Sequence, residues 1–536
     1  MKKFLVILLS LSLLLPLPAL AADQADLLQK MEALSKELDR LKQQMQEMQQ
    51  KEAAKEERIT VVEKKAEQAA GPSWLEIGGD YRFRLDSLKG KVHDYMRYDS
   101  TAALPFPGML IHTASQPGYN AKNDSLMLNR FGLNLQAKAT EDIQVKARLL
   151  MYKVFGHDTS GPVTSPFFGP DRSGVFDGNV SHVPQDNTLR VDQAYATWSN
   201  TGDAPVWFSV GRRPSTGGVP TNIRQNTEKI GTAGVPGLLI DYAFDGMTLG
   251  YAPDIDALPG AYAKICYGRG FDSGYRTPTS LKDTDMIGIN IVPYDTDQFH
   301  AELQLNRAFN MMSNPGIPNV WGAVQANVGD IDQYGLLLMG KVDKVGPGDF
   351  NWFVSGALSK THPSDDRYQL PFYSTNGGLT WNNAGYGLLY DDPAFGGEKK
   401  SRTGSAIYVG ARYDIKSTGT KIGLEYNHGS KYWITFAPAS DDLWTGKLGT
   451  RGDVYEVYLV QELNKKPIAK RGKAFFRLGY QYYKFNYTGS NGWLGDPKKI
   501  SDLTSTPSTM ADVLGTQMYP PLKNAHDIYL TFDVLF

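Results

Sequence analysis

From Ser73 to the C-terminus, hydrophobic and polar residues alternate with a period of two in one segment after another. In the first segment, one face carries Leu75, Ile77, Tyr81, Phe83 and Leu85, and the other carries Glu76, Asp80, Arg82, Arg84 and Asp86. Successive side chains of a strand point to opposite faces, so this pattern predicts β-strands. Charged faces on so many strands would disrupt a sandwich core, whereas in a barrel they line a water-filled lumen. The chain is therefore expected to form an all-β transmembrane antiparallel β-barrel.

The expected strands are joined alternately by short turns and long loops, as in outer-membrane barrels. Asp245-Gly246 is interpreted as one of the short turns, following a strand at 238–244. Direct counting gives seventeen strands, but both ends of the barrel should lie in the periplasm, which requires an even number. Merging 247–253 with 260–269 gives sixteen strands, the number we expect; a further strand within 270–283 would give eighteen.

The last strand ends the chain on an aromatic residue. Ile528, Leu530, Phe532, Val534 and Phe536 share one face of this segment. Outer-membrane barrels finish in this way, and the segment resembles the signal that the barrel-assembly machinery recognises. Phe532, Val534 and Phe536 are the residues expected to carry that membrane-assembly signal.

The first residues have the features of a secretory signal peptide. A positive start (Met1-Lys-Lys) is followed by an apolar run from Phe4 to Leu17 and by the small residues of Ala19-Leu20-Ala21. The apolar run is shorter than the about 20 residues that a spanning helix needs, and Pro16 interrupts it. We expect residues 1–21 to be removed and the mature chain to be exported.

Residues 22–70 have the heptad pattern of a periplasmic α-helical coiled-coil stalk, which Gly71-Pro72 ends before the barrel at 71–536. A single helix would leave its apolar seam in water, so the seam predicts a homo-oligomer. A trimer is expected over a dimer only by analogy with porins. The seam consists of Leu27, Met31, Leu34, Leu38, Leu41, Met45 and Met48.

The composition of the chain mainly excludes certain partners and kinds of site. The chain has 536 residues and a formal net charge of -1, which does not suggest a nucleic-acid partner. Cys266 is the only cysteine, so no disulfide framework, zinc cluster or haem-attachment motif is expected. The eight histidines are not spaced as metal ligands, and no catalytic motif is visible. We expect no enzymatic activity, no cofactor and no metal.

The Gly- and Pro-rich segment 211–224 is the sharpest candidate for function, because it follows the fifth expected strand, where sixteen-stranded porins fold a loop into the pore. Arg212, Arg213 and Arg224 would then favour anions at a constriction. The alternative is an exposed loop whose arginines pair with acids such as Glu228. The full set of pore-lining candidates is Arg82, Arg84, Arg130, Arg148, Arg212, Arg213, Arg224, Glu302, Arg412, Asp414 and Glu425.

Three segments, 210–224, 239–246 and 266–270, resemble a family of uncharacterised porin-like outer-membrane proteins of Gram-negative bacteria. They read Val-Gly-Arg-Arg-Pro-Ser-Thr-Gly-Gly-Val-Pro-Thr-Asn-Ile-Arg, Leu-Ile-Asp-Tyr-Ala-Phe-Asp-Gly and Cys-Tyr-Gly-Arg-Gly. That family also carries an N-terminal coiled coil. The chain is more loosely similar to trimeric substrate-selective porins with coiled-coil extensions. The resemblance implies an envelope location and a barrel, and no particular substrate.

These features together predict an outer-membrane porin, a water-filled diffusion channel for small hydrophilic solutes with a weak preference for anions. Its contacts would be outer-membrane lipid, the barrel-assembly machinery and further copies of itself. Two alternatives stay open. The barrel could sheathe a multihaem cytochrome in an electron conduit, or the stalk could tether the envelope as a structural element.

Overall fold

The computed structural model describes Lys36 and residues 74–99, 113–157, 167–168, 184–215, 217–278, 280–313, 325–369, 372–373, 379–380, 385–393, 396–437, 442–463, 467–469, 472–509, 512–513 and 515–536. The expected signal peptide, and the expected stalk apart from Lys36, lie outside these residues. The chain divides into two compact units, Met1–Ser73 and Trp74–Phe536. The second unit contains the barrel.

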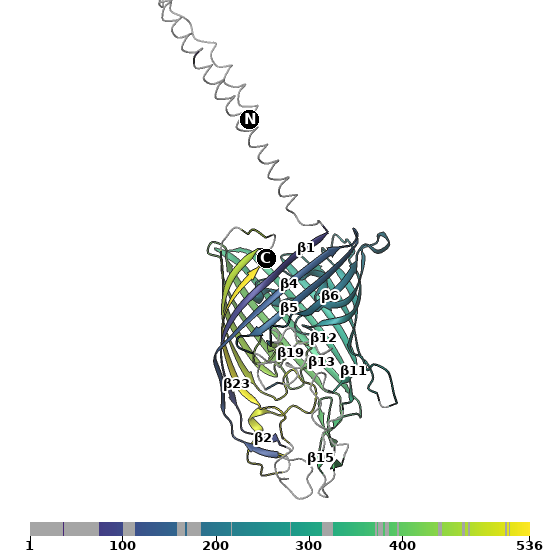
Figure 1. The fold of residues 1–536 in the computed structure, drawn as a ribbon, viewed down its shortest axis with the longest axis vertical. Coiled ribbons are helices and arrows are strands. Elements are labelled where there is room, and N and C mark those ends of the chain that lie inside the picture. Colours follow the sequence, from purple (N-terminus) through teal and green to yellow (C-terminus); the bar gives the residue numbers. More distant parts are fainter. Residues whose placement is uncertain are drawn as a thin grey trace, which may run out of the picture. The chain divides into compact units, whose positions relative to one another are not determined.

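Sixteen antiparallel strands close into one barrel, which confirms the expected architecture and strand number (Figure 1). Each strand pairs with its neighbours in chain order, and β1 pairs with the last strand. The barrel strands are β1 (Leu75–Val92), β4 (Asn120–Lys138), β5 (Ile143–Val154), β6 (Arg190–Trp198), β7 (Val206–Pro214), β8 (Ala243–Tyr251), β9 (Tyr262–Phe271), β10 (Thr284–Asp295), β11 (Phe299–Met312), β12 (Asn327–Val345), β13 (Gly348–Pro363), β19 (Thr403–Ile415), β20 (Thr420–Gly429), β21 (Gly452–Glu462), β22 (Lys473–Phe485) and β23 (Leu522–Leu535).

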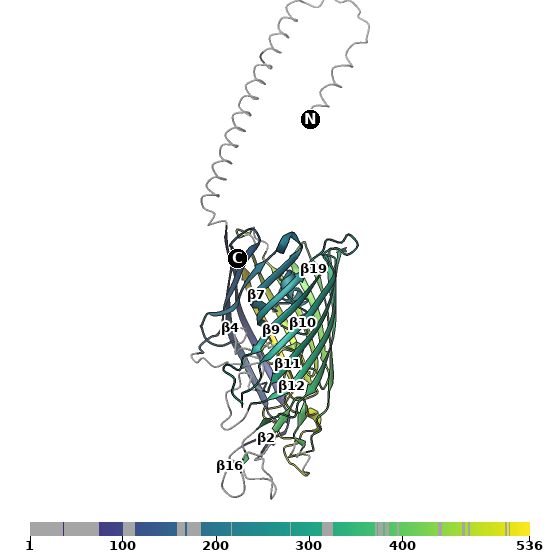
Figure 2. The same cartoon turned by 90° about the vertical axis from the view of Figure 1, so that its right-hand side faces the viewer.

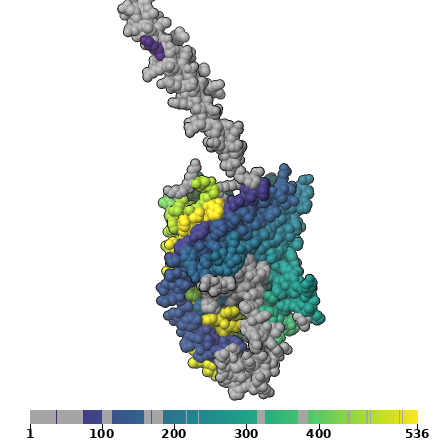
Figure 3. Space-filling view, viewed as in Figure 1, coloured from purple at the N-terminus to yellow at the C-terminus, as the bar shows by residue number. Residues whose placement is uncertain are grey.

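The seam of the barrel joins the first strand to the end of the chain. β1 and β23 pair in register from Asp80 with Leu535 onward, and the Phe536 amide donates to the Gly79 carbonyl over 3.0 Å. A β-carbon on Gly79 would lie 2.4 Å from the Gly132 carbonyl and 2.7 Å from the Phe536 ring, so only glycine fits here. Figure 3 shows the purple β1 between the yellow C-terminal strand and the dark-blue strands, as one continuous wall.

Short connections lie at the end where β1 begins, and long loops lie at the other end (Figures 1 and 2). This alternation is that of outer-membrane barrels. The loops contain small elements of their own: β2 (Tyr95–Tyr98), β3 (Thr113–Gln116), β14 (Tyr368–Gln369), β15 (Phe372–Tyr373), β16 (Leu379–Thr380), β17 (Gly385–Gly387), β18 (Tyr390–Asp391), one short α-helix, α2 (Thr221–Gln225), and the 3₁₀ turns η1 (Thr201–Asp203), η2 (Gly231–Ala233), η4 (Lys447–Gly449) and η5 (Ile500–Asp502).

The path of the chain around β8 differs from the expectation. Asp245 and Gly246 are not a turn but lie within β8, and β8 and β9 are separate strands joined by the turn 252–261. Residues 238–242, expected to be in a strand, belong instead to the loop before β8. The expectation thus counted one strand too many at 238–244 and one too few at 247–269, and the two errors cancel in the total of sixteen. The apolar run at 238–242 is buried inside the barrel, and burial on all sides removes the period-two signal that separates a strand from a packed loop.

The two faces of the wall differ as a membrane-spanning barrel requires. Outward apolar side chains such as Ile77 and Leu424 are 64% and 61% exposed, whereas inward charged side chains such as Arg82 are almost fully buried. Aromatic contacts lie near both rims, for example Phe299 with Trp352 (6.4 Å between ring centroids) and Tyr426 with Tyr455 (5.0 Å). Rims of this composition are typical of membrane interfaces. Among the described residues, no helix is both long and apolar enough to cross a bilayer.

The lumen contains a packed interior made by the long loops. One apolar cluster includes Leu239, Phe353 and Trp433, and a second includes Trp444 and Phe485. Such clusters would be unusual for loops that extend into water, because large apolar side chains are stabilised by about 1.5–3 kcal/mol each when buried. Parts of the long loops therefore fold back into the barrel.

Candidate functional site

The loop between β7 and β8, residues 215–242, enters the lumen; we name it the lumen loop. It carries α2 and η2, and its side chains are buried along most of its length. Leu238 and Leu239 are both 0% exposed. β7 is the fifth strand of the barrel in chain order, so this loop leaves the wall where the sequence analysis expected an inward fold.

Two features of the sequence allow this loop to fold tightly. A β-carbon on Gly218 would lie only 1.7 Å from the carbonyl oxygen of Val235, so the two arms of the loop can approach only at a glycine. The Gly237 amide donates to the Val219 carbonyl over 3.0 Å and joins the same two arms. The loop is thus closed at its base before it crosses the lumen.

A second lumen loop lies between β20 and β21; it spans 430–451, of which 430–437 and 442–451 are described. It pairs with the lumen loop through its backbone. The Phe436 amide donates to the Leu239 carbonyl over 2.9 Å, and the Asp241 amide donates to the Phe436 carbonyl over 3.0 Å. Thr435 Oγ1 also donates to the Leu238 carbonyl over 2.7 Å. The two loops therefore form one body inside the barrel.

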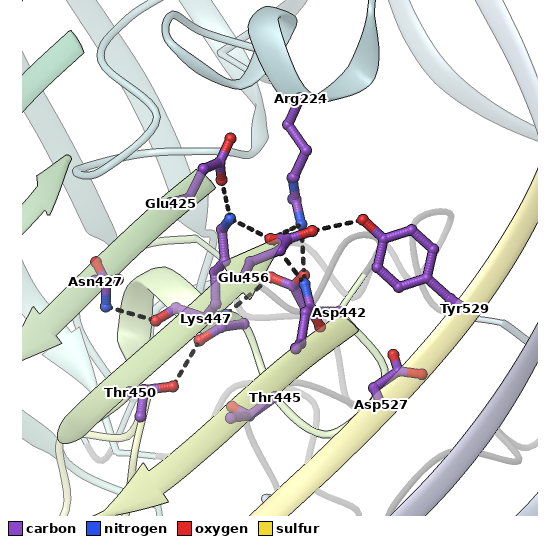
Figure 4. A network of polar contacts seen from close by, with 12 residues as sticks. Arg224, Glu425, Asn427, Asp442, Thr445, Lys447, Thr450, Glu456, Asp527 and Tyr529 are labelled. Carbon is purple, nitrogen blue, oxygen red and sulfur yellow. Dashed lines mark hydrogen bonds and ion pairs between the residues drawn. The ribbon is translucent and has the colours of Figure 1, made fainter. Parts of the chain in front are cut away.

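Arg224 on α2 ties this body to the far wall (Figure 4). Its Nη1 lies 3.0 Å from Asp442 Oδ1, on the second lumen loop, and 3.2 Å from Glu456 Oε2, on β21. All three side chains are at most 8% exposed. Buried charges are tolerated only when they are paired and hydrogen-bonded, so these contacts specify where the lumen loop sits.

Lys447 completes this cluster, which we name the latch: Arg224, Glu425, Asp442, Lys447 and Glu456. Lys447 Nζ lies 2.6 Å from Glu456 Oε2 and also pairs with Glu425, and the Lys447 amide donates to Asp442 Oδ2 over 2.9 Å. Within the latch, two cations face three carboxylates. The latch therefore carries no excess of positive charge and is not a source of positive field in the lumen.

The backbone of α2 is also held by the wall. Arg412 of β19 donates to the Ile223 carbonyl, and Arg477 Nη1 of β22 donates to the Arg224 carbonyl over 3.0 Å. These carbonyls are at the C-terminal end of a short helix, where the regular helical partners run out; the Ile223 carbonyl also accepts from the Asn226 amide over 3.3 Å. Asn226, just beyond α2, donates to Glu462 Oε1 over 3.0 Å. Four strands of the far wall, β19 to β22, therefore contact this turn, because Lys421 of β20 donates to Asn226 Oδ1 as well.

A cavity of about 640 Å³, which we name the vestibule, lies between the lumen loop and β1, β4, β5 and β6 at the short-turn end. Its lining carries both signs of charge in paired form. Arg148 Nη2 lies 2.6 Å from Asp80 Oδ1, and Arg82 pairs with Asp533. A cavity of this volume, lined by both apolar and charged side chains, can hold a small solute and its water.

All but one of the predicted pore-lining residues lie on the inward side of the wall or on the lumen loop. The exception is Arg212, which is opposite Asp245 in the β7–β8 register, on the face that also carries the exposed Val210 and Met247. It therefore lies on the outer face and pairs with Asp245 at 3.4 Å. The other predicted residues are on the inward side of the wall or on the lumen loop: Arg82, Arg84, Arg130, Arg148, Arg213, Arg224, Glu302, Arg412, Asp414 and Glu425.

The inward candidates lie in several separate groups. Arg82, Arg130 and Arg148 line the vestibule, whereas Arg224 and Glu425 belong to the latch. Glu302 lies apart from both and accepts a hydrogen bond from Asn290 Nδ2 over 2.6 Å. The partner of Arg224 is not Glu228, the acid considered from the sequence.

Sequence reasoning missed the second lumen loop and with it Asp442 and Lys447. One signal was present: the segment has more large apolar residues than an exposed loop needs, including Trp433, Phe436 and Trp444, which are at most 3% exposed. Among the described residues, no three His, Cys, Asp or Glu side chains form a group that could hold a metal ion.

A family described as "Protein of unknown function (DUF3373)" matches residues 120–536, well over half of the chain. The chain belongs to this family. The match begins at the start of β4 and includes the lumen loop, the second lumen loop and all residues of the latch. No curated protein matches the chain.

Several solved outer-membrane proteins are similar in fold, each over 86% of this chain. They are the trimer form of in-vitro folded OmpT from Vibrio cholerae (12% identity, TM-score 0.38, 99% of that chain), Salmonella typhi OmpF in complex with daunomycin (9%, 0.37, 97%) and an anion-selective porin from Comamonas acidovorans (10%, 0.38, 99%). Likenesses at this level say nothing about the solute that this chain handles.

Proposed function

We propose that the protein is an outer-membrane porin, a channel for small hydrophilic solutes whose lumen is narrowed by the lumen loop and the second lumen loop. The observation that carries the proposal is the latch: a loop from one side of the barrel is bonded through buried charges to the opposite wall, beside the vestibule. The short-turn end faces the periplasm and the long loops face outward. No enzymatic role is proposed.

Conductance across planar bilayers tests this proposal. The purified protein should give small, discrete current steps. Excision of residues 219–236 should increase the step size, because it removes the central part of the lumen loop. The excision is feasible because Gly218 and Gly237 are already adjacent: a β-carbon on Gly237 would lie 3.4 Å from the Gly218 carbonyl oxygen.

Shortening the loop at 275–281 is the matched control. Its Tyr275 is 101% exposed, and none of its described residues lines the vestibule or belongs to the latch, so its loss should leave conductance unchanged. Absence of current from both the intact protein and the excised variant, in preparations shown to be folded, would rule out a channel.

The proposed weak preference for anions is limited by ion pairing. Arginines are prominent on the inward faces, but Arg82, Arg148 and Arg224 each pair with a carboxylate. Paired charges produce little net field beyond the about 8–10 Å of a Debye length. The reversal potential in a salt gradient should therefore show an anion-to-cation permeability ratio only slightly above one; a clear cation preference would contradict this part of the proposal.

The two other roles are weaker proposals. A barrel that sheathes a cytochrome needs an open lumen, and the two lumen loops occupy that space; haem that copurifies with the protein would favour the sheath. A tethering role for the stalk predicts membrane blebbing after deletion of residues 22–70, with conductance unchanged. A normal envelope would argue against the tether.

The proposed assembly is a homo-oligomer, most simply a trimer, held by the stalk seam in the periplasm. Apart from Lys36, the stalk is outside the described residues, so the support comes from the heptad pattern alone. The proposed role of Phe532, Val534 and Phe536 as an assembly signal is supported by their position at the closing seam of the barrel.

A further inference from the structure

A second cavity, of about 140 Å³, lies among the long loops, at the end of the barrel opposite the vestibule. It is lined by the loop between β22 and β23 and by parts of the loops that precede β19 and β21. Most of its surface is apolar. Phe485, Trp493 and Ile500, which line it, are each 3% exposed.

The cavity is built on a network of backbone hydrogen bonds. The Leu389 amide donates to the Trp493 carbonyl over 2.9 Å, and the Gly495 amide donates to the Gly387 carbonyl over 2.9 Å, so these two loops pair like short strands. The indole of Trp493 donates to the Met312 carbonyl over 3.0 Å and is thereby fixed in orientation. The walls of the cavity are thus formed in advance, which lowers the entropy cost of binding a ligand.

The charged side chains of Lys498 and Arg451 at the cavity already have hydrogen-bond partners: a carboxylate for Lys498, and backbone carbonyls for Arg451. Lys498 Nζ lies 2.5 Å from Asp391 Oδ2, and Arg451 donates to the Thr488, Gly489 and Gly492 carbonyls. A charged ligand would have to displace one of these partners, which is costly in a buried site. The cavity therefore favours an uncharged ligand.

Two tyrosines, Tyr386 and Tyr519, are among the residues that line the cavity. Burial raises the pKa of Tyr386, with a contribution from nearby Asp391, and burial likewise raises the pKa of Tyr519. Both hydroxyls therefore stay protonated at neutral pH and can donate or accept a hydrogen bond.

We infer that this cavity binds an uncharged compound with a single aromatic ring and a hydroxyl group, a phenol. Its volume is similar to that of an apolar cavity of about 150 Å³ that holds benzene. Rings at its edge, such as Phe485 and Trp493, offer the tilted and edge-on contacts that aromatic ligands prefer. That such a compound is also a solute of the channel rests on the proposed function.

Calorimetric titration of the full-length protein in detergent tests the inference, with phenol, toluene and glucose as probes. Leu494→Trp fills the cavity, and the matched control Ile468→Trp makes the same change at a residue that is 105% exposed in the turn between β21 and β22. We expect phenol affinity to fall at least ten-fold in Leu494→Trp and to be unchanged in Ile468→Trp. Tyr386→Phe should weaken phenol about five-fold and leave toluene unchanged, because one hydrogen bond is lost.

Equal heats for phenol in the wild type and in Leu494→Trp would show partition into detergent only and would overturn the inference. Binding of glucose without binding of phenol would also overturn it. If Leu494→Trp does not fold, the ratio of phenol affinity to toluene affinity in Tyr386→Phe is the deciding measurement. An unchanged ratio would overturn the inference. Conductance of the same preparations separates the two proposals: a conducting protein without a phenol site refutes only the site, and a phenol-binding protein without current refutes only the channel.

Discussion

Replacing Arg224 by alanine is the most direct perturbation of the latch. The change leaves Asp442 and Glu456 buried, with Lys447 as the remaining cation of the latch. Removing one partner of a buried ion pair costs about 3–5 kcal/mol, because the other charges stay in a poorly solvated site. We expect the free energy of unfolding to fall by that amount and the single-channel conductance to rise, since the lumen loop loses its tie to the far wall.

Two measurements check this expectation: denaturant unfolding in lipid vesicles, followed by fluorescence, and current recording in planar bilayers. Arg212→Ala is the matched control, because Arg212 lies outside the latch: its Nε donates to the Asp192 carbonyl over 3.0 Å, and its ion-pair partner Asp245 is 56% exposed. Such a pair contributes about 0–1 kcal/mol, so both properties should be close to those of the wild type.

A double-mutant cycle separates the ion pair from general loosening. Glu456→Gln removes one of the stranded carboxylates, so its combination with Arg224→Ala should be less destabilising than the sum of the single changes by at least about 1 kcal/mol. Additive losses, or an Arg224→Ala variant with unchanged conductance and unfolding, would refute the view that the latch positions the lumen loop.

Three further predictions concern the fold and the assembly. Gly218→Ala should destabilise the protein by about 1–3 kcal/mol and raise conductance, because its β-carbon would meet a backbone carbonyl at 1.7 Å; Gly356→Ala, with no atom within 4 Å, should be neutral in the same unfolding and conductance assays. Deletion of Phe536 should lower the fraction of folded, heat-modifiable protein in the outer membrane, and a normal folded fraction would argue against an assembly signal. Leu34→Glu combined with Leu41→Glu should reduce the assembled mass measured by size analysis in mild detergent; a monomeric wild type would contradict the seam.

The alternation of side chains determined the barrel from local information. Each strand residue faces lipid or lumen by parity alone, so Ile77 outside and Arg82 inside follow from the sequence of β1. The even number of strands followed from the expectation that the first strand begins and the last strand ends on the same side of the membrane. The same parity would have placed Arg212 outside, had the pairing with β8 been known.

Only the tertiary structure decided what fills the barrel. Whether a long loop extends into water or folds inward depends on partners that are far away in sequence, as Arg224 with Glu456 and Leu239 with Phe436 illustrate. Burial on all sides also removes the periodic signal that separates a strand from a packed loop, so the apolar pattern at 238–242 predicts a strand where the structure has a loop. The tertiary structure also decided which inward arginines are paired with carboxylates, as Arg82 is with Asp533 and Arg224 with Asp442. The sequence therefore determined the wall, and long-range packing determined the passage.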